Sequence, residues 1–100
     1  MKTTTYYHGT NNSAAILNAL LGNDSIRGEF HMTPDVAVAK NYGREVVAIT
    51  VEGDLDKAHI GIINKDGNLN KAVGTGIEVV LKDRAAVVEF YSKLYDAEVV

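Results

Sequence analysis

The sequence has no cysteine, no long apolar run and no excess of basic residues, and each absence excludes a class of protein. Without cysteine there is no disulfide framework and no thiolate metal site, which fits a reducing compartment. No stretch reaches the roughly 18 apolar residues of a membrane-spanning helix, and residues 1–8 lack the apolar core of a signal peptide. We therefore expect a cytoplasmic protein with no membrane partner.

The charge balance and the histidine spacing exclude further classes. The formal net charge is -3, so bulk electrostatics does not favour nucleic acid, which we do not expect as a partner. His8, His31 and His59 are far apart and form no His-x-x-x-His pair, so we expect no metal site. The sequence also has no phosphate loop, no dinucleotide fingerprint and no serine in a nucleophile elbow.

The pattern that is present predicts one α+β domain over residues 1–100. We expect strands over 3–8, 29–32, 46–51, 59–63 and 77–81. Gly9 ends the first strand, and the apolar run 46–51 indicates a central strand covered on both faces. We expect about three helices, over 13–21 after a cap at Asn12–Ser13, over 33–43 after the start Thr33-Pro34-Asp35, and from Asp83 through Tyr95. Connections are expected at 23–28, at 54–57 as one helical turn, and at 65–68.

Three short segments contain residues that could carry chemistry. His8-Gly9-Thr10 lies where the first strand ends, and the strand that contains His31 runs into a helix ending at Tyr42. Glu78 lies within a strand between apolar neighbours, where a carboxylate is costly to desolvate unless it faces water or a polar site. Taken singly, each residue also has a structural interpretation, with His8 and His31 satisfied by backbone, Tyr42 packed in the core and Glu78 on an exposed edge.

Together the three segments resemble the ADP-ribosyltransferase superfamily, in particular the branch related to the poly-ADP-ribose polymerases. His8-Gly9-Thr10 matches the first motif of that family, and residues 29–43 align without a gap on the segment that contains its signature tyrosine. In this register His31 takes the place of the signature tyrosine. Tyr42 takes the place of the tyrosine that stacks on nicotinamide, and Glu78-Val79-Val80 resembles the Glu-Tyr-Val motif.

The resemblance implies a small ADP-ribosyltransferase-like fold in which two short antiparallel sheets form a cleft for NAD. It implies a mono-ADP-ribosyltransferase that cleaves the nicotinamide–ribose bond and transfers ADP-ribose to a macromolecular acceptor, which we expect to be a protein. The implied catalytic residues are Glu78, His8 and His31. The implied NAD-binding residues are His8, Gly9, Thr10, His31 and Tyr42. For the pyrophosphate, Arg27, Arg44 and the helix N-terminus at Ser13 are candidates.

These roles agree with the chemistry that cleaving NAD requires. A carboxylate at Glu78 would stabilise the positive charge that develops on the ribose, and His8 would hydrogen-bond a ribose hydroxyl. Gly9 allows close approach, so that its backbone N–H and C=O can pair with the carboxamide. The rings of His31 and Tyr42 would enclose the pyridinium by stacking and cation–π attraction.

The chain departs from the family pattern at two positions. The triad is His–His–Glu because of His31, and Gly76 stands where arginine-modifying toxins of the superfamily carry a glutamate, which disfavours arginine as the acceptor. The chain is also shorter than most family members, and its economy of length suggests a specialised effector of a phage or mobile element.

Two alternative functions follow from the same residues. The first is a catalytically inactive module of the same fold that binds NAD, ADP-ribose or a partner protein, which the departure at His31 keeps open. The second is an NAD-dependent RNA 2′-phosphotransferase-like enzyme, which also begins with a His-Gly-Thr-type motif. The acidic net charge and the presence of only three arginines, Arg27, Arg44 and Arg84, argue against the second.

Overall fold

The computed structural model describes residues 2–22, 30–55, 60–63, 78–81 and 83–100, with 60–63 and 78–79 described by their backbone. Its strands are β1 (Thr3–Thr10), β2 (Phe30–Met32), β3 (Glu45–Glu52), β4 (Ile60–Ile63), β5 (Glu78–Leu81) and β6 (Leu94–Val99). Its helices are α1 (Ser13–Leu21), α2 (Val36–Ala39) and α3 (Arg84–Lys93). The expected α+β architecture, with three helices and two antiparallel sheets, is confirmed for these parts of the chain.

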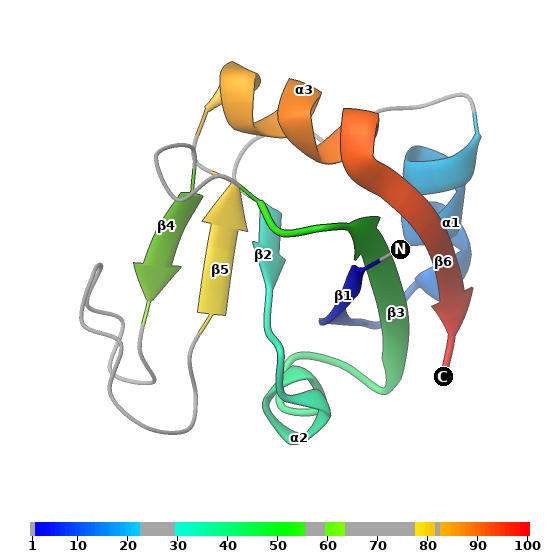
Figure 1. The fold of residues 1–100 in the computed structure, drawn as a ribbon. Coiled ribbons are helices and arrows are strands. Elements are labelled where there is room, and N and C mark those ends of the chain that lie inside the picture. The colour runs from blue at the N-terminus through cyan, green and yellow to red at the C-terminus, as the bar shows by residue number, and fades with distance from the viewer. Residues whose placement is uncertain (1, 23–29, 56–59, 64–77, 82) are drawn as a thin grey trace.

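The six strands form two three-stranded antiparallel sheets, one in the order β1-β3-β6 and the other in the order β2-β5-β4. In the described part of the chain, the sheets meet at one antiparallel bridge between Tyr7 and Thr33. The amide of Tyr7 donates to the Thr33 carbonyl over 2.7 Å, and the amide of Thr33 donates to the Tyr7 carbonyl over 2.9 Å. Figure 1 shows the strands side by side from β4 on the left to β6 on the right, with α3 crossing above them. The two sheets therefore adjoin along β1 and β2.

The core lies on one face of β3 and beneath α3. Val47, Ile49 and Val51 alternate along β3 and are fully buried, and Phe90 of α3 is buried with them. Each such side chain contributes roughly 1.5–3 kcal/mol by leaving water. The side chains of Ala48 and Thr50 are only partly buried. The prediction that β3 is covered on both faces is therefore right for one face and only partly right for the other.

Each helix begins at a side chain that accepts a hydrogen bond from its first turn. Asn12 caps α1 by accepting from the amide of Ala15 (3.1 Å), and Asp83 caps α3 by accepting from Ala86 (2.8 Å). Asp35 caps α2, and its carboxylate accepts from the amide of Ala37 over 2.9 Å. The caps predicted at Asn12 and Asp83 are confirmed.

Several predicted bounds were wrong for reasons that lie in the tertiary structure. The first strand continues through Gly9 to Thr10, because both residues pair with β3. The helix predicted over 33–43 begins only after Asp35, because the backbone of Thr33 is bonded to Tyr7. The helix ends at Ala39. In the tighter turn that follows, the amide of Asn41 donates to the Val38 carbonyl and the amide of Tyr42 donates to the Ala39 carbonyl.

The last helix was predicted too long. It ends at Lys93, and the segment that follows it, including Leu94 and Tyr95, forms strand β6 along the free edge of β3. The predicted loop 23–28, the turn 65–68 and residues 56–57 lie outside the described residues, as do Glu29, His59 and Ile77. Asp54 and Leu55, the first half of the expected turn 54–57, are not helical.

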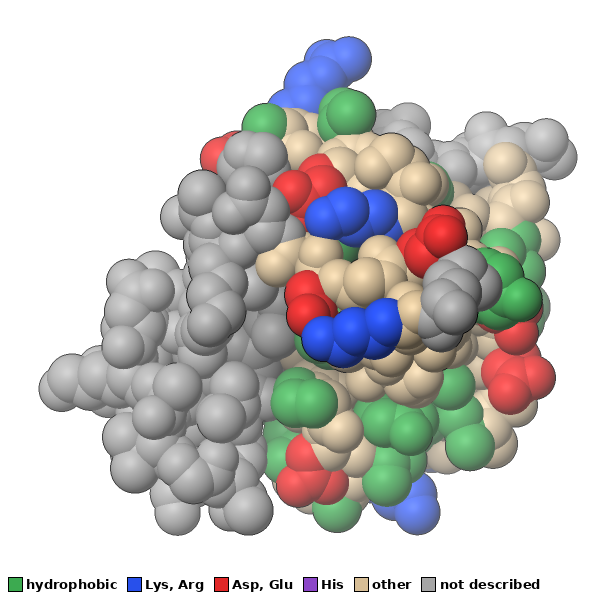
Figure 2. Space-filling model, in the orientation of Figure 1, with side chains coloured by type: hydrophobic (Ala, Val, Ile, Leu, Met, Phe, Trp, Pro, Cys, Tyr) green, Lys and Arg blue, Asp and Glu red, His purple; other side chains and the backbone are tan. Residues whose placement is uncertain are grey.

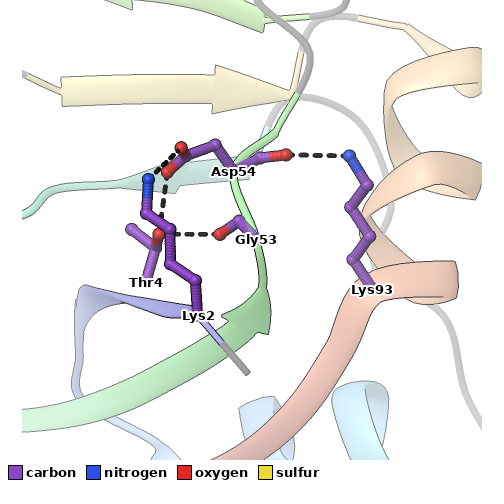
Figure 3. Close-up of polar contacts among 5 residues, drawn as sticks. All are labelled: Lys2, Thr4, Gly53, Asp54 and Lys93. Carbon is purple, nitrogen blue, oxygen red and sulfur yellow. Dashed lines mark hydrogen bonds and ion pairs between the residues drawn. The ribbon is translucent and has the colours of Figure 1, made fainter.

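An exposed polar cluster holds the end of β3 to the start of β1 and the end of α3 (Figure 3). Gly53 adopts φ 69°, which favours glycine, and turns the chain so that Asp54 meets the amine of Lys2 at 2.9 Å and the hydroxyl of Thr4 at 2.8 Å. The amine of Lys93 donates to the backbone carbonyl of Asp54. Hydrogen bonds from Lys2 and then Thr4 lower the pKa of Asp54, and the same carboxylate raises the pKa of Lys2. The cluster lies at the opposite end of β1 from His8 and Gly9.

None of the helices in the described ranges is long and apolar enough to cross a membrane.

Candidate functional site

A pocket of about 360 Å³ opens where β1 and β2 part beyond the Tyr7–Thr33 bridge. Six of its lining residues come from the two strands and the bridge, namely Tyr7, His8, Gly9, His31, Met32 and Thr33. The remaining two, Ala39 and Tyr42, come from α2 and the turn after it. The pocket thus lies on the seam between the sheets, with α2 as one wall.

His8 is held in place by a hydrogen bond across this seam and by a ring contact. Its Nδ1 lies 2.6 Å from the His31 carbonyl oxygen, and its ring stacks on Phe30 with centroids 4.4 Å apart and planes inclined by 18°. Because a carbonyl oxygen can only accept, Nδ1 carries the proton, and in the neutral ring Nε2 is then an acceptor. Burial lowers the pKa of His8 from its ordinary 6.5 and outweighs the raising effect of the hydrogen bond to the His31 carbonyl. The ring is therefore a neutral, oriented acceptor at neutral pH.

The backbone of Gly9 faces the pocket because of the pairing on either side of it. Tyr7 directs its N–H and C=O to Thr33. The N–H and C=O groups of successive residues point to opposite edges of a strand. The backbone groups of His8 therefore point toward β3, and those of Gly9 point toward β2. There the two strands have separated and Gly9 lines the pocket. The amide and carbonyl of Gly9 thus form a donor–acceptor edge beside the His8 ring.

Position 9 also has to be glycine because α2 packs directly against it. A Cβ atom there would overlap the backbone carbonyl of Ala39 and come within 3.1 Å of the Cβ of Tyr42. Gly43, in the turn after α2, also packs directly against β1, and a Cβ there would overlap the backbone of Thr10. The two glycines let α2 approach β1 closely enough to form one wall of the pocket.

Two further rings line the pocket. Tyr42 is 57% exposed, so the alternative that it packs in the core is wrong. His31 is half-buried, and its backbone carbonyl holds His8. Tyr42 and His31 come from the segment after α2 and from β2, respectively, so the pocket has an aromatic side chain on each of two different elements.

Glu78 begins β5, and the strand register relates its position to the pocket. His31 pairs with Val80, and Met32 pairs with Val79. If this register is continued by one residue, position 78 lies opposite Thr33. Alternation along a strand puts positions 78 and 80 on one face of the sheet, which is the face of position 31. The side chain of Glu78 lies outside the described residues.

The residues predicted to hold the pyrophosphate lie elsewhere or outside the described residues. The amide of Ser13, at the α1 N-terminus, already donates to the Glu45 carboxylate over 3.0 Å. Arg44 lines a different pocket, and Arg27 lies outside the described residues. The Thr10 hydroxyl accepts from the amide of Asn12, and Thr10 is not among the residues that line the pocket. Within the described chain, no lysine or arginine lines the pocket at the seam.

Four lining residues, Tyr7, Met32, Thr33 and Ala39, were not predicted for the site. Tyr7 and Gly9 lie on the same face of β1, so the strand period offered a signal for Tyr7. The other three depend on how β2 and α2 meet β1, which no local pattern contains. In the described ranges, no three His, Asp or Glu side chains converge to hold a metal ion.

No family model, curated protein or solved structure that was compared with the chain matches it. The interpretation of the site therefore depends on the geometry above and on the motifs of the sequence.

Proposed function

We propose that this chain is a mono-ADP-ribosyltransferase that binds the nicotinamide and adjoining ribose of NAD in the pocket at the seam. The observation that carries the proposal is that His8, Gly9, His31 and Tyr42, four residues that the family resemblance assigns to NAD, line a single pocket. Its volume of about 360 Å³ lies near the lower end of the range of small-molecule sites, roughly 300–1,000 Å³. That volume suits one half of a dinucleotide.

The pocket offers nicotinamide a polar edge and aromatic faces. The amide and carbonyl of Gly9 match the carbonyl and amine of the carboxamide, which would fix the ring in its plane. The rings of Tyr42 and His31 would then cover the faces of the pyridinium, whose positive charge is attracted to the face of Tyr42. Because Tyr42 is more than half exposed, it can be covered by a ligand without losing core contacts.

His8 would orient the ribose. With Nδ1 bound to the His31 carbonyl, the free Nε2 accepts a hydrogen bond from a ribose hydroxyl. The stack on Phe30 and the hydrogen bond leave the ring little freedom, so its ordering is complete before NAD binds. An oriented ribose presents the face of C1′ opposite the nicotinamide to the acceptor.

The reaction breaks the bond between C1′ of the ribose and N1 of nicotinamide. The electron pair of that bond leaves with nicotinamide, which becomes neutral, and C1′ acquires oxocarbenium character. A carboxylate at position 78 would stabilise this positive charge. An oxygen of the acceptor then forms the new bond to C1′. A hydroxyl or water releases its proton in this step, whereas a carboxylate acceptor becomes an ester and releases none.

The test is nicotinamide release from NAD, measured by chromatography for the wild type, Glu78→Gln and Glu52→Gln, with and without cell lysate as the acceptor source. Glu52 is exposed at the end of β3 and gives a matched loss of one carboxylate. We expect Glu78→Gln to slow release by about 10²–10³-fold and Glu52→Gln to leave it unchanged. Transfer is followed by mass spectrometry of lysate proteins that gain ADP-ribose.

The outcome also separates the proposal from the inactive module. NAD binding without release or transfer, with or without lysate, would identify a module that binds the dinucleotide and does not cleave it. Absence of NAD binding would refute the transferase and a module that binds the dinucleotide.

A further inference from the structure

A second pocket, of about 570 Å³, lies against a different face of α2. It is lined by Val36, Lys40, Gly43, Arg44, Val46 and Val100. Figure 2 shows hydrophobic side chains gathered around α2 and the adjoining ends of β3 and β6, with a basic and an acidic side chain at their lower margin. The residues that line the pocket combine aliphatic side chains with two cations.

The two cations of this pocket, Lys40 and Arg44, form no ion pair with another described residue. Lys40 and Arg44 are exposed, and in the described residues neither side chain makes a hydrogen bond or an ion pair. The backbone amide of Arg44 donates to the Asn11 side chain over 3.0 Å, which leaves the guanidinium outside this hydrogen bond. Two cations without an ion-pair partner among the described residues, beside one pocket, favour the binding of an anion there.

The side chains that line the second pocket indicate which kind of anion it can bind. Val36 is half-buried and Val100 is 71% exposed, so these two valines provide the accessible aliphatic contact, whereas Val46 is buried. None of the described residues that line the pocket is aromatic, so they offer no stacking platform of the kind on which proteins hold single-stranded bases. An aliphatic surface with two cations is complementary to a peptide that carries an aliphatic side chain next to carboxylates.

The second pocket adjoins the first through paired residues. Gly9 lines the pocket at the seam, and its cross-strand partner Val46 lines the second pocket. The amide of Val100 donates to the Val46 carbonyl, which adds a third position to the same row. Two strand spacings are about 10 Å, which an extended peptide covers in roughly three residues.

We propose that this second pocket docks an acidic, aliphatic segment of a protein acceptor and so presents a residue about three positions away to the pocket at the seam. The docking itself depends only on the second pocket, and the presentation depends on the function proposed above. The segment binds through its carboxylates to Lys40 and Arg44 and through its aliphatic side chain to the valines.

The test is fluorescence anisotropy of a labelled short peptide containing leucine followed by two glutamates, titrated with the full chain. A second peptide carries glutamines in place of the glutamates. We expect the acidic peptide to bind saturably and at least about tenfold more tightly than the amide peptide. Lys40→Glu should weaken binding of the acidic peptide by about tenfold, and Lys40→Ala by less. The control Arg84→Glu, at an exposed position of α3, changes the net charge by the same amount and should have no effect.

Equal binding of the two peptides, or an equal loss in Lys40→Glu and Arg84→Glu, overturns the docking site. Nicotinamide release, measured on the same samples without peptide, reports separately on the proposed function, and Lys40→Glu should retain it. Peptide binding without release would refute the function and leave the docking site standing. With release established, peptides that carry a serine at increasing distance from the glutamates should be labelled best at a spacing of about three residues, and equal labelling at every spacing would refute the presentation.

Discussion

Gly9→Ala is the substitution that most directly tests how β1, α2 and the pocket are assembled. The added methyl group would overlap the backbone carbonyl of Ala39 and crowd the Cβ of Tyr42. A backbone carbonyl cannot turn aside as a flexible side chain can, so α2 has to move away from β1. That movement shifts the Gly9 donor–acceptor edge relative to Tyr42, and both line the pocket.

The expected cost follows from overpacking a close contact, which is typically about 1–3 kcal/mol. For a domain of this size each kcal/mol lowers the Tm by about 4–8 °C, so Gly9→Ala should melt roughly 5–20 °C below the wild type. If the pocket binds NAD as proposed, the affinity should fall by at least about tenfold, because the carboxamide loses its matched edge.

The matched control is Gly53→Ala. Gly53 has φ 69°, and a Cβ there would meet nothing within 4 Å, so the substitution costs backbone strain of about 1–2 kcal/mol and no overlap. It lies at the opposite end of β1 from the pocket. Thermal melts and calorimetric titration with NAD should show lower stability for both variants and weaker NAD binding for Gly9→Ala alone.

An unchanged Tm for Gly9→Ala would refute the close approach of α2 to β1. A lower Tm with unchanged NAD affinity would support the close packing of α2 on β1 and refute the role of Gly9 in NAD binding. Equal loss of affinity in both glycine variants would show that binding follows global stability instead of the geometry of the pocket.

Three further predictions concern single side chains. The pKa of His8 is below 6.5 in the folded chain, so the unfolded chain binds a proton at this ring more readily than the folded chain does. The free energy of unfolding is therefore unaffected by this titration above pH 6.5 and decreases as the pH falls below 6.5. His8→Phe, which cannot titrate and can still stack on Phe30, should therefore lose less Tm between about pH 7.5 and pH 5 than the wild type, and an equal loss would contradict this origin. Tyr42→Ala should weaken NAD binding by about 1–2 kcal/mol in calorimetric titration while changing the Tm little, because the ring is 57% exposed. Tyr91→Phe removes the 2.7 Å hydrogen bond from α3 to the Ala19 carbonyl of α1 and should lower the free energy of unfolding by about 1 kcal/mol in urea titrations.

The sequence predicted the fold best where a local signal decides the structure. The caps at Asn12 and Asp83, the strand cores and the end of α1 before Gly22 all follow from residues within one turn of the element. The C-terminal strand was missed because the spacing of Val87, Phe90, Tyr91 and Leu94 continues a helical pattern past Lys93, while pairing with the free edge of β3 ends the helix there. The start of α2 was predicted at Thr33-Pro34-Asp35, and its cap is Asp35 for a similar reason, since the backbone of Thr33 is hydrogen-bonded to Tyr7.

The same distinction applies to the candidate site. His8, Gly9, His31 and Tyr42 were predicted as a group from the family resemblance, and they line one pocket. Arg44 and Ser13 were assigned to the pyrophosphate by their charge and by their position in the chain. Their actual neighbours, the second pocket and the Glu45 carboxylate, come from contacts across the sheet that no local pattern contains.

The single bridge between Tyr7 and Thr33 has a consequence for how a ligand and the fold stabilise one another. The walls of the pocket belong to separate sheets that share two backbone hydrogen bonds, so a molecule bound there would link the two sheets across the seam. When its free concentration is about 100 times its dissociation constant, such a ligand adds roughly 2.7 kcal/mol to the free energy of unfolding. Amide hydrogen exchange should slow in β2 and β5 as well as in β1 and β3, so that β3, which contributes no residue to the lining of the pocket, also reports ligand binding.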